Sequence, residues 1–144
     1  MTDALTLRVR ALELSLAALQ QSLAVTDAKI KPPSIINIQF AGETLPAGPK
    51  VKGLGAVPIG KPVLLWAVLP WRITSSFVNS QWFANGVQVP NSATVGVSAS
   101  SAGAQPISMM NVFTGTFTAA PQLSLYSGVA TVIDAWMVGG LAWI

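Results

Sequence analysis

The chain contains no cysteine and no histidine, and its 144 residues include only eight basic and five acidic side chains. Without cysteine there can be neither a disulfide nor a thiolate metal site. Without histidine the usual base for a serine nucleophile is missing, and a zinc site would depend on carboxylates alone. There is also no P-loop or nucleophile-elbow motif. The composition therefore favours a protein that is not an enzyme and that holds no cofactor and no metal.

Two carboxylates, Glu43 and Asp134, follow the first thirty-two residues, and a pair of carboxylates can hydrolyse a glycosidic bond. Asp134 stands between Ile133 and Ala135 in an apolar segment. There a single hydrogen-bonded or outward-facing carboxylate is the commoner arrangement. We therefore expect structural roles for both residues and predict no catalytic residues.

Positive charge is sparse, with a formal net charge of +3. Five dispersed cations after the first thirty residues are too few for a nucleic-acid groove and are better suited to guarding strand edges. Hydrophobic residues make up 51% of the chain, but polar residues, glycine and proline break every run before the eighteen or so residues that a spanning helix needs. The sequence thus predicts neither a nucleic-acid partner nor membrane insertion.

A heptad pattern occupies the first thirty residues, where Ala4 to Ile30 contain no glycine and no proline. Leucines 5, 12 and 19 and Thr26 fall at position d, and residues 9, 16, 23 and 30 fall at position a. Arg8 at g and Glu13 at e have the spacing of an interchain ion pair, and Pro32-Pro33 ends the helix. The pattern predicts a coiled-coil stalk over 1–31 that gathers copies of the chain. The predicted seam residues are Leu5, Val9, Leu12, Leu16, Leu19, Leu23 and Ile30.

The same stripe has other interpretations. Leu7 and Leu14 lie at position f, outside the seam, so the helix could instead pack on its own domain. A secretory signal fits less well, because Asp3 and Glu13 interrupt the apolar stretch and no cleavage site follows. Leucine at both a and d does not select a dimer over a trimer.

Residues 34–144 have the pattern of short strands. Ile36, Ile38 and Phe40 alternate with polar residues, and Asn85-Gly86 between two strand-like runs is the preferred hairpin turn. Residues 63–69 are apolar on both faces, as in a strand buried on both sides, and Pro70 is expected to end that strand. Eight or nine strands at spacings of about ten residues predict an antiparallel β-sandwich or jelly-roll-like domain.

Five tryptophans are the candidates for ligand binding. Trp66 and Trp136 lie in apolar strands and are expected in the core. Trp71 and Trp82 flank polar stretches and are the candidate platform on which a sugar ring could stack. Trp143, near the C-terminus, could pack in a subunit interface.

The layout of a leucine heptad helix at residues 5–30, a joint at Pro32-Pro33 and a compact β head at 34–144 resembles the small fibre, knob and decoration proteins of tailed bacteriophages. The resemblance implies a homotrimer on the outer surface of a capsid or tail. Its partners would be its own copies and other virion proteins such as the major capsid protein. Two hypotheses follow: a non-enzymatic virion protein that stabilises or projects from the capsid, and a tail-fibre adhesin that binds a receptor or host-surface glycan.

Overall fold

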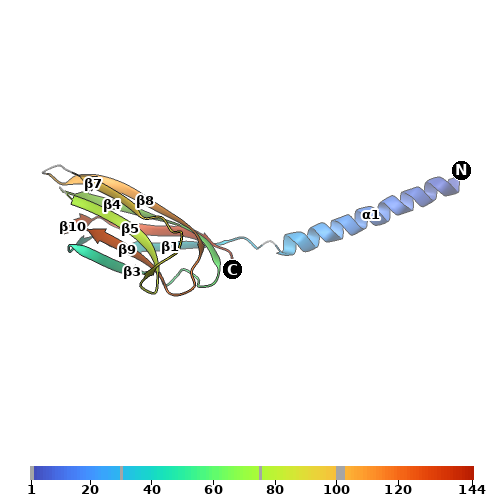
Figure 1. Ribbon diagram of the computed structural model, residues 1–144. Coiled ribbons are helices and arrows are strands. Elements are labelled where there is room, and N and C mark those ends of the chain that lie inside the picture. The colour runs from blue at the N-terminus through green and yellow to red at the C-terminus, as the bar shows by residue number, and fades with distance from the viewer. Residues whose placement is uncertain (1, 30, 75, 100–102) are drawn as a thin grey trace. The chain divides into compact units, whose positions relative to one another are not determined.

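The computed structural model describes residues 2–29, 31–74, 76–99 and 103–144 (Figure 1). The chain divides into two units, Met1–Pro32 and Pro33–Ile144. The first contains helix α1 (Thr2–Lys29), with Asp3 in its first turn, where a carboxylate complements the helix dipole. The second unit is made of antiparallel strands. The prediction of a mainly antiparallel β chain with one N-terminal helix is therefore confirmed for the described residues.

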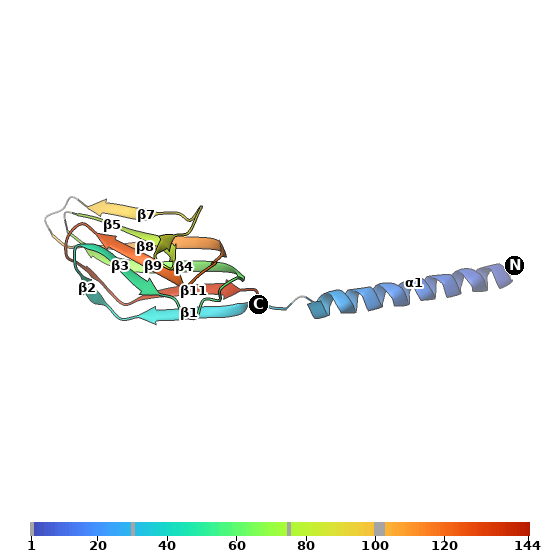
Figure 2. The same cartoon turned by 60° about the horizontal axis from the view of Figure 1, so that its bottom comes forward.

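The β unit has two sheets, and Figure 2 shows β1 and β11 side by side at one edge of it. The first sheet has the order β1-β11-β4-β10-β2, and β8 pairs with the other edge of β4. Its strands are β1 (Ser34–Phe40), β2 (Glu43–Leu45), β4 (Pro62–Ile73), β8 (Gln105–Thr116), β10 (Thr131–Ile133) and β11 (Trp136–Ala142).

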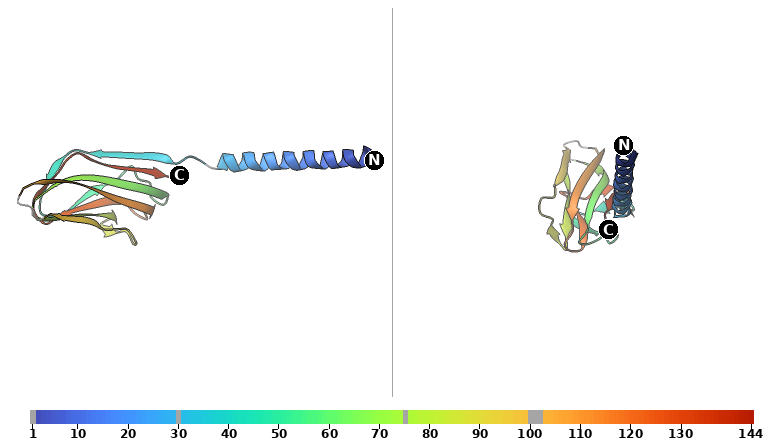
Figure 3. Two further views of the ribbon diagram at one scale, coloured as in Figure 1. Left: turned by 90° about the horizontal axis from the view of Figure 1, so that it is seen from above. Right: turned by 90° about the vertical axis from the view of Figure 1, so that its right-hand side faces the viewer.

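The second sheet has the order β3-β9-β5-β6, and β7 also pairs with β5. Its strands are β3 (Gly48–Gly53), β5 (Ser76–Ala84), β6 (Val87–Gln88), β7 (Val95–Ala99) and β9 (Pro121–Ser127). The chain passes repeatedly from one sheet to the other, as in a jelly-roll-like fold. Figure 3 shows the strands of this unit from two further sides.

The core lies between the two sheets because alternate residues of each strand point inward. Along β4 the inward residues are fully buried, and those of β5 and β9 meet them from the second sheet. The largest of these buried side chains are Trp71, Trp82, Leu65, Leu69, Leu123 and Leu125.

One polar group joins the sheets inside this core. Asn111 of β8 is fully buried, and its Nδ2 donates to the carbonyl oxygen of Ser80 at 3.0 Å and to the Ser80 Oγ at 2.9 Å. Its Oδ1 accepts a hydrogen bond of 2.9 Å from the Nε1 of Trp82. All three groups would be costly to bury without partners, so the network fixes how β8 of the first sheet sits against β5 of the second.

The predicted hairpin is confirmed. Asn85 and Gly86 have φ angles of 49° and 83°, and Ala84 pairs with Val87 on either side of the turn. Positive φ at both central residues is what the favoured two-residue hairpin turn requires.

The prediction that Pro70 ends its strand is wrong. β4 continues to Ile73, and along one edge its partner changes from β11, which pairs up to Val68, to β10, which pairs from Trp71. Pro70 lies at this change, where its carbonyl accepts a hydrogen bond of 2.9 Å from the backbone N–H of Asp134. The missing N–H of proline faces the same gap, so the strand loses no ladder bond there.

Candidate functional site

The predicted tryptophan platform is not on the surface. Trp71 is 1% exposed and Trp82 is 0% exposed, and both belong to the core between the sheets. Because neither ring can stack on a ligand from outside, the structure contradicts the platform prediction for these two residues. Trp136 is in the core as expected, with its ring stacked on Phe40 at a centroid separation of 3.9 Å. Trp66, expected in the core, is instead half-buried on the outside of the first sheet.

The outer face of the first sheet is mainly apolar and carries no charge in its three central rows. Strand register gives these rows as Ile35, Leu141, Leu64 and Thr114, then Asn37, Gly139, Trp66 and Val112, and then Gln39, Met137, Val68 and Met110. Ile35 is 83% exposed and Met110 60% exposed. The apolar face is our name for the eight large apolar side chains of these rows, which are Ile35, Leu64, Trp66, Val68, Met110, Val112, Met137 and Leu141. Asn37, Gln39 and Thr114 are the polar residues that lie among and beside them.

Trp66 lies flat at the centre of the apolar face. A Cβ built on Gly139, its neighbour on β11, would lie 2.5 Å from the Trp66 Nε1, so the indole ring covers this glycine directly. On the inner side a Cβ on Gly140 would meet Leu65 Cδ2 and the Leu64 carbonyl oxygen, each at 2.5 Å. The two glycines thus sit within an extended strand and allow close packing on both of its faces.

A hollow of about 320 Å³ opens near the first sheet, where β4 changes partner from β11 to β10. It lies beside the apolar face and shares two of its residues, Val68 and Met137. The indole N–H of Trp136, which also lines the hollow, is buried and has no hydrogen-bond partner in the described structure. The lining residues are Gln39, Phe40, Val68, Pro70, Ala135, Trp136 and Met137.

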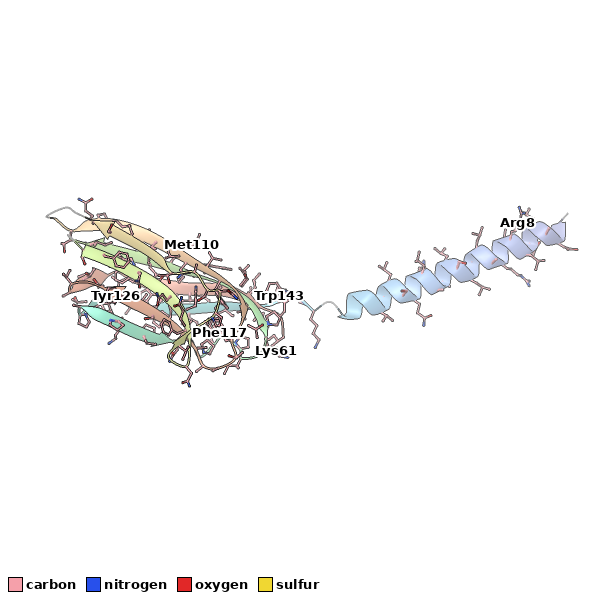
Figure 4. All side chains as sticks on the ribbon, in the orientation of Figure 1. Arg8, Lys61, Met110, Phe117, Tyr126 and Trp143 are labelled. Atoms are coloured by element: carbon pink, nitrogen blue, oxygen red, sulfur yellow. The ribbon has the colours of Figure 1, made fainter. Side chains whose placement is uncertain are left out.

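The outer face of the second sheet has a different character. Phe77 and Tyr126 lie there with ring centroids 6.4 Å apart and exposures of 43% and 37%. Asn79 pairs with Tyr126 across the strands, and Gln81 donates a hydrogen bond of 2.9 Å from its Nε2 to the Oγ1 of Thr94. Figure 4 labels Met110 on β8 and Tyr126 on β9, one residue from each outer face. We call Phe77, Asn79, Gln81 and Tyr126 the polar face.

The predicted helix seam is fully accessible in the single chain. Leu5, Leu12 and Leu19 are 64–69% exposed, and Leu16 and Leu23 are 56% and 62% exposed. Val9 at 45% is also exposed, as are Arg8 and Glu13, the proposed interchain ion pair. Ile30, the last predicted seam residue, lies outside the described residues. A helix cannot bury its own stripe, so these side chains are available to partner helices.

The two carboxylates considered for catalysis lie in separate ion pairs. Glu43 pairs with Lys52, and Asp134 accepts from the Nε of Arg72 at 3.0 Å and 3.1 Å. In the described part of the chain no group of three or more acidic or other metal-ligating residues comes together. No helix within the described ranges is long and apolar enough to span a membrane.

Sequence reasoning missed both outer faces. The apolar face had a signal, because residues 63–69 are apolar at every position, including those that now point outward. We interpreted this run as a strand covered on both sides, whereas one side is covered by the second sheet and the other is partly open. The polar face had no comparable signal, because Phe77 and Tyr126 lie forty-nine positions apart and meet only through strand pairing.

Comparison with known proteins supports the fold. No protein-family model matches the chain, and no curated protein matches it significantly. A solved chain from Bacillus endospore appendages, which form disulfide-linked pili, is similar with a TM-score of 0.50 and 12% identity, over 79% of this chain and 93% of that one. At this identity the likeness concerns the fold alone.

Two other solved structures align at lower TM-scores. The Eiger TNF of S. frugiperda gives 0.45 with 11% identity, over 79% of this chain and 94% of that one. The sugar-binding C-terminal domain of EclA gives 0.40 with 18% identity, over 76% and 81%. Neither alignment carries an argument about what this chain does.

Proposed function

We propose that the chain is a non-enzymatic structural protein of a bacteriophage virion, a homotrimeric capsid decoration or head-fibre protein on the outer surface of the particle. The observation that carries the proposal is the exposed apolar seam of α1 on a helix followed directly by a compact β unit. Such a layout fits a stalk that joins three heads. The partners are further copies of this chain and other virion proteins such as the major capsid protein.

The energetics of the seam favour association. Burying one leucine or valine side chain contributes roughly 1.5–3 kcal/mol, so the six described seam residues supply on the order of 10 kcal/mol per helix. This gain has to offset an association cost of about 4–15 kcal/mol for lost translational and rotational freedom. A stalk of four heptads is therefore a marginal oligomer by itself, and contacts between the heads would add to it.

The mechanism is avidity. Three heads on one stalk contact a threefold site on a capsid together, so each weak contact acts at the high effective concentration set by the others. No reaction chemistry is needed for this role.

The stalk is tested by exchanging one leucine for aspartate at two places on α1. Leu16→Asp puts a charge into the seam and should reduce the sedimenting species to a single chain. Leu14→Asp, at an f position that is exposed in the single chain, carries the same helix-propensity cost and should leave the assembly unchanged. If both variants sediment like the parent, the seam is not the joining element. Binding of the parent to purified capsids, lost in Leu16→Asp, would support the virion role.

A second candidate function is an adhesin that binds a receptor or host-surface glycan, and the polar face favours it. An aromatic pair beside the half-buried amides of Asn79 and Gln81 is the chemistry that stacks on and hydrogen-bonds to sugars. Phe77 and Tyr126 thus replace the buried tryptophans as the candidate platform. Glycan-array binding that disappears in Tyr126→Ala, in a protein that keeps its circular dichroism spectrum, would favour the adhesin. Capsid binding that survives Tyr126→Ala would favour the structural role.

A further inference from the structure

The apolar face is unusual for a surface. The inward residues of β4 already face the second sheet, and a solvent-facing side would normally alternate to polar residues. Instead three successive outward positions of β4 are Leu64, Trp66 and Val68. Moving along β4, the first outward charge is Arg72, which is paired with Asp134 beyond the last row of the apolar face. Contiguous apolar surface without charge marks a place that another macromolecule covers.

We infer that a second copy of this chain covers the apolar face, so that the β heads pack on one another through their first sheets. The inference rests on the proposed function, because the stalk brings the copies together. It adds a second interface that the heptad pattern does not contain.

Chain connectivity argues for a second copy over any other partner. Helix α1 ends at Lys29 and β1 begins at Ser34, so at most about 18 Å of extended chain separates them. In a parallel coil every copy therefore starts its β1 within this reach of its own helix end, and the helix ends lie together. β1 is an edge strand of the first sheet, and its second residue, Ile35, is the most exposed member of the apolar face. The tether thus keeps the starts of β1, and with them the Ile35 corner of each apolar face, within reach of one another.

The size of the face explains why the stalk is needed. Four strands about 4.8 Å apart, over about six residues of 3.3 Å each, cover a flat area of roughly 400 Å², in which Asn37, Gln39 and Thr114 are included. A stable interface normally buries about 800 Å² on each partner. The heads alone should therefore associate weakly, and the stalk makes their contact persistent by raising its effective concentration. At the centre of the face the rigid indole of Trp66 is the type of side chain that dominates interface energies.

The natural absence of cysteine provides a clean test. Val112 on the apolar face and Val51 on the outer side of the second sheet are both 44% exposed in the single chain. Val112→Cys and Val51→Cys are therefore matched probes whose thiols should react at similar rates in an unassembled chain. In the full-length assembly we expect the thiol at position 112 to be labelled at least about tenfold more slowly than the thiol at position 51, because side chains in an interface core are shielded from solvent.

Sedimentation of the same samples separates the two proposals. An oligomer with protection at 112 alone supports the inference, and adding Leu16→Asp should abolish that protection. An oligomer in which both thiols react equally fast overturns the head contact and leaves the stalk intact. If Leu16→Asp leaves the oligomer intact and the thiol at position 112 still protected, α1 is not what joins the copies, but the contact between the apolar faces is supported. A protein that sediments as a single chain at every concentration overturns both.

Discussion

Replacing Asn111 with alanine tests whether the buried polar network holds the two sheets together. The change removes three hydrogen bonds and leaves the Trp82 indole N–H in the core without an acceptor. A hydrogen bond contributes about 1 kcal/mol net, and a buried polar group left unpaired costs about 1–3 kcal/mol. We expect the free energy of unfolding to fall by about 3 kcal/mol, most of it from the stranded N–H and the lost bonds to Ser80.

The assay is thermal unfolding followed by circular dichroism at one fixed protein concentration, because dissociation of an oligomer shifts the midpoint. For a β unit of this size a loss of 3 kcal/mol lowers the midpoint by roughly 12 °C. Asn79→Ala, on the outer side of the same sheet as Ser80, is the matched control and should change stability by less than about 0.5 kcal/mol.

A double-mutant cycle isolates the contact itself. Trp82→Phe removes the indole donor. In the Asn111→Ala variant, which already lacks the acceptor, Trp82→Phe should lower the free energy of unfolding by less than it does in the parent, and the difference should be about 1 kcal/mol or more. An Asn111→Ala variant that unfolds within a degree or two of the parent would contradict this role of the network. Additive effects of the two substitutions would contradict it as well.

Three further outcomes are expected. Gly86→Ala forces alanine to adopt the φ of +83° in the hairpin turn and should lower the free energy of unfolding in a urea titration by about 1–2 kcal/mol. Gly55→Ala, in open space without a positive φ, is the control and should be close to neutral in the same titration. Gly139→Ala should displace the Trp66 ring and cost about 1–3 kcal/mol, with a changed near-ultraviolet circular dichroism spectrum; an unchanged spectrum and midpoint would contradict the packing described. Arg72→Gln breaks an exposed ion pair and should cost less than about 0.5 kcal/mol at low and high salt alike, and a larger loss would mean that this pair carries more than surface electrostatics.

Local patterns in the sequence predicted local structure well. The helix needed only a glycine- and proline-free stretch and a proline stop, and the turn at Asn85-Gly86 needed only two residues that tolerate positive φ. The alternation of Ile36, Ile38 and Phe40 gave a strand with those residues toward the core. Such signals depend only on residues that are close in sequence, so they can be recognised without knowledge of the tertiary fold.

Features that depend on distant pairing were not predictable in this way. Trp82 follows polar residues and was interpreted as exposed, but Ser80 and Asn111 are themselves buried because they satisfy one another across the core. Pro70 was interpreted as a strand end, although a change of partner strand leaves its missing N–H without consequence.

The glycine pair shows the same limit. A glycine pair in a sequence commonly marks a bend, yet Gly139 and Gly140 lie within β11, where Trp66 and Leu65 of the neighbouring strand occupy the space of their missing side chains. Only the register of β11 on β4 reveals this, and that register brings together residues more than seventy positions apart.

Whether copies of the chain associate is best measured by sedimentation equilibrium of the unmodified full-length chain over a wide range of concentrations. The exposed seam of α1 and the apolar face predict an oligomer, and the proposed homotrimer would have three times the 15.0 kDa chain mass. A mass of 15.0 kDa at every concentration would contradict the proposed assembly, because the seam would then have no partner helices.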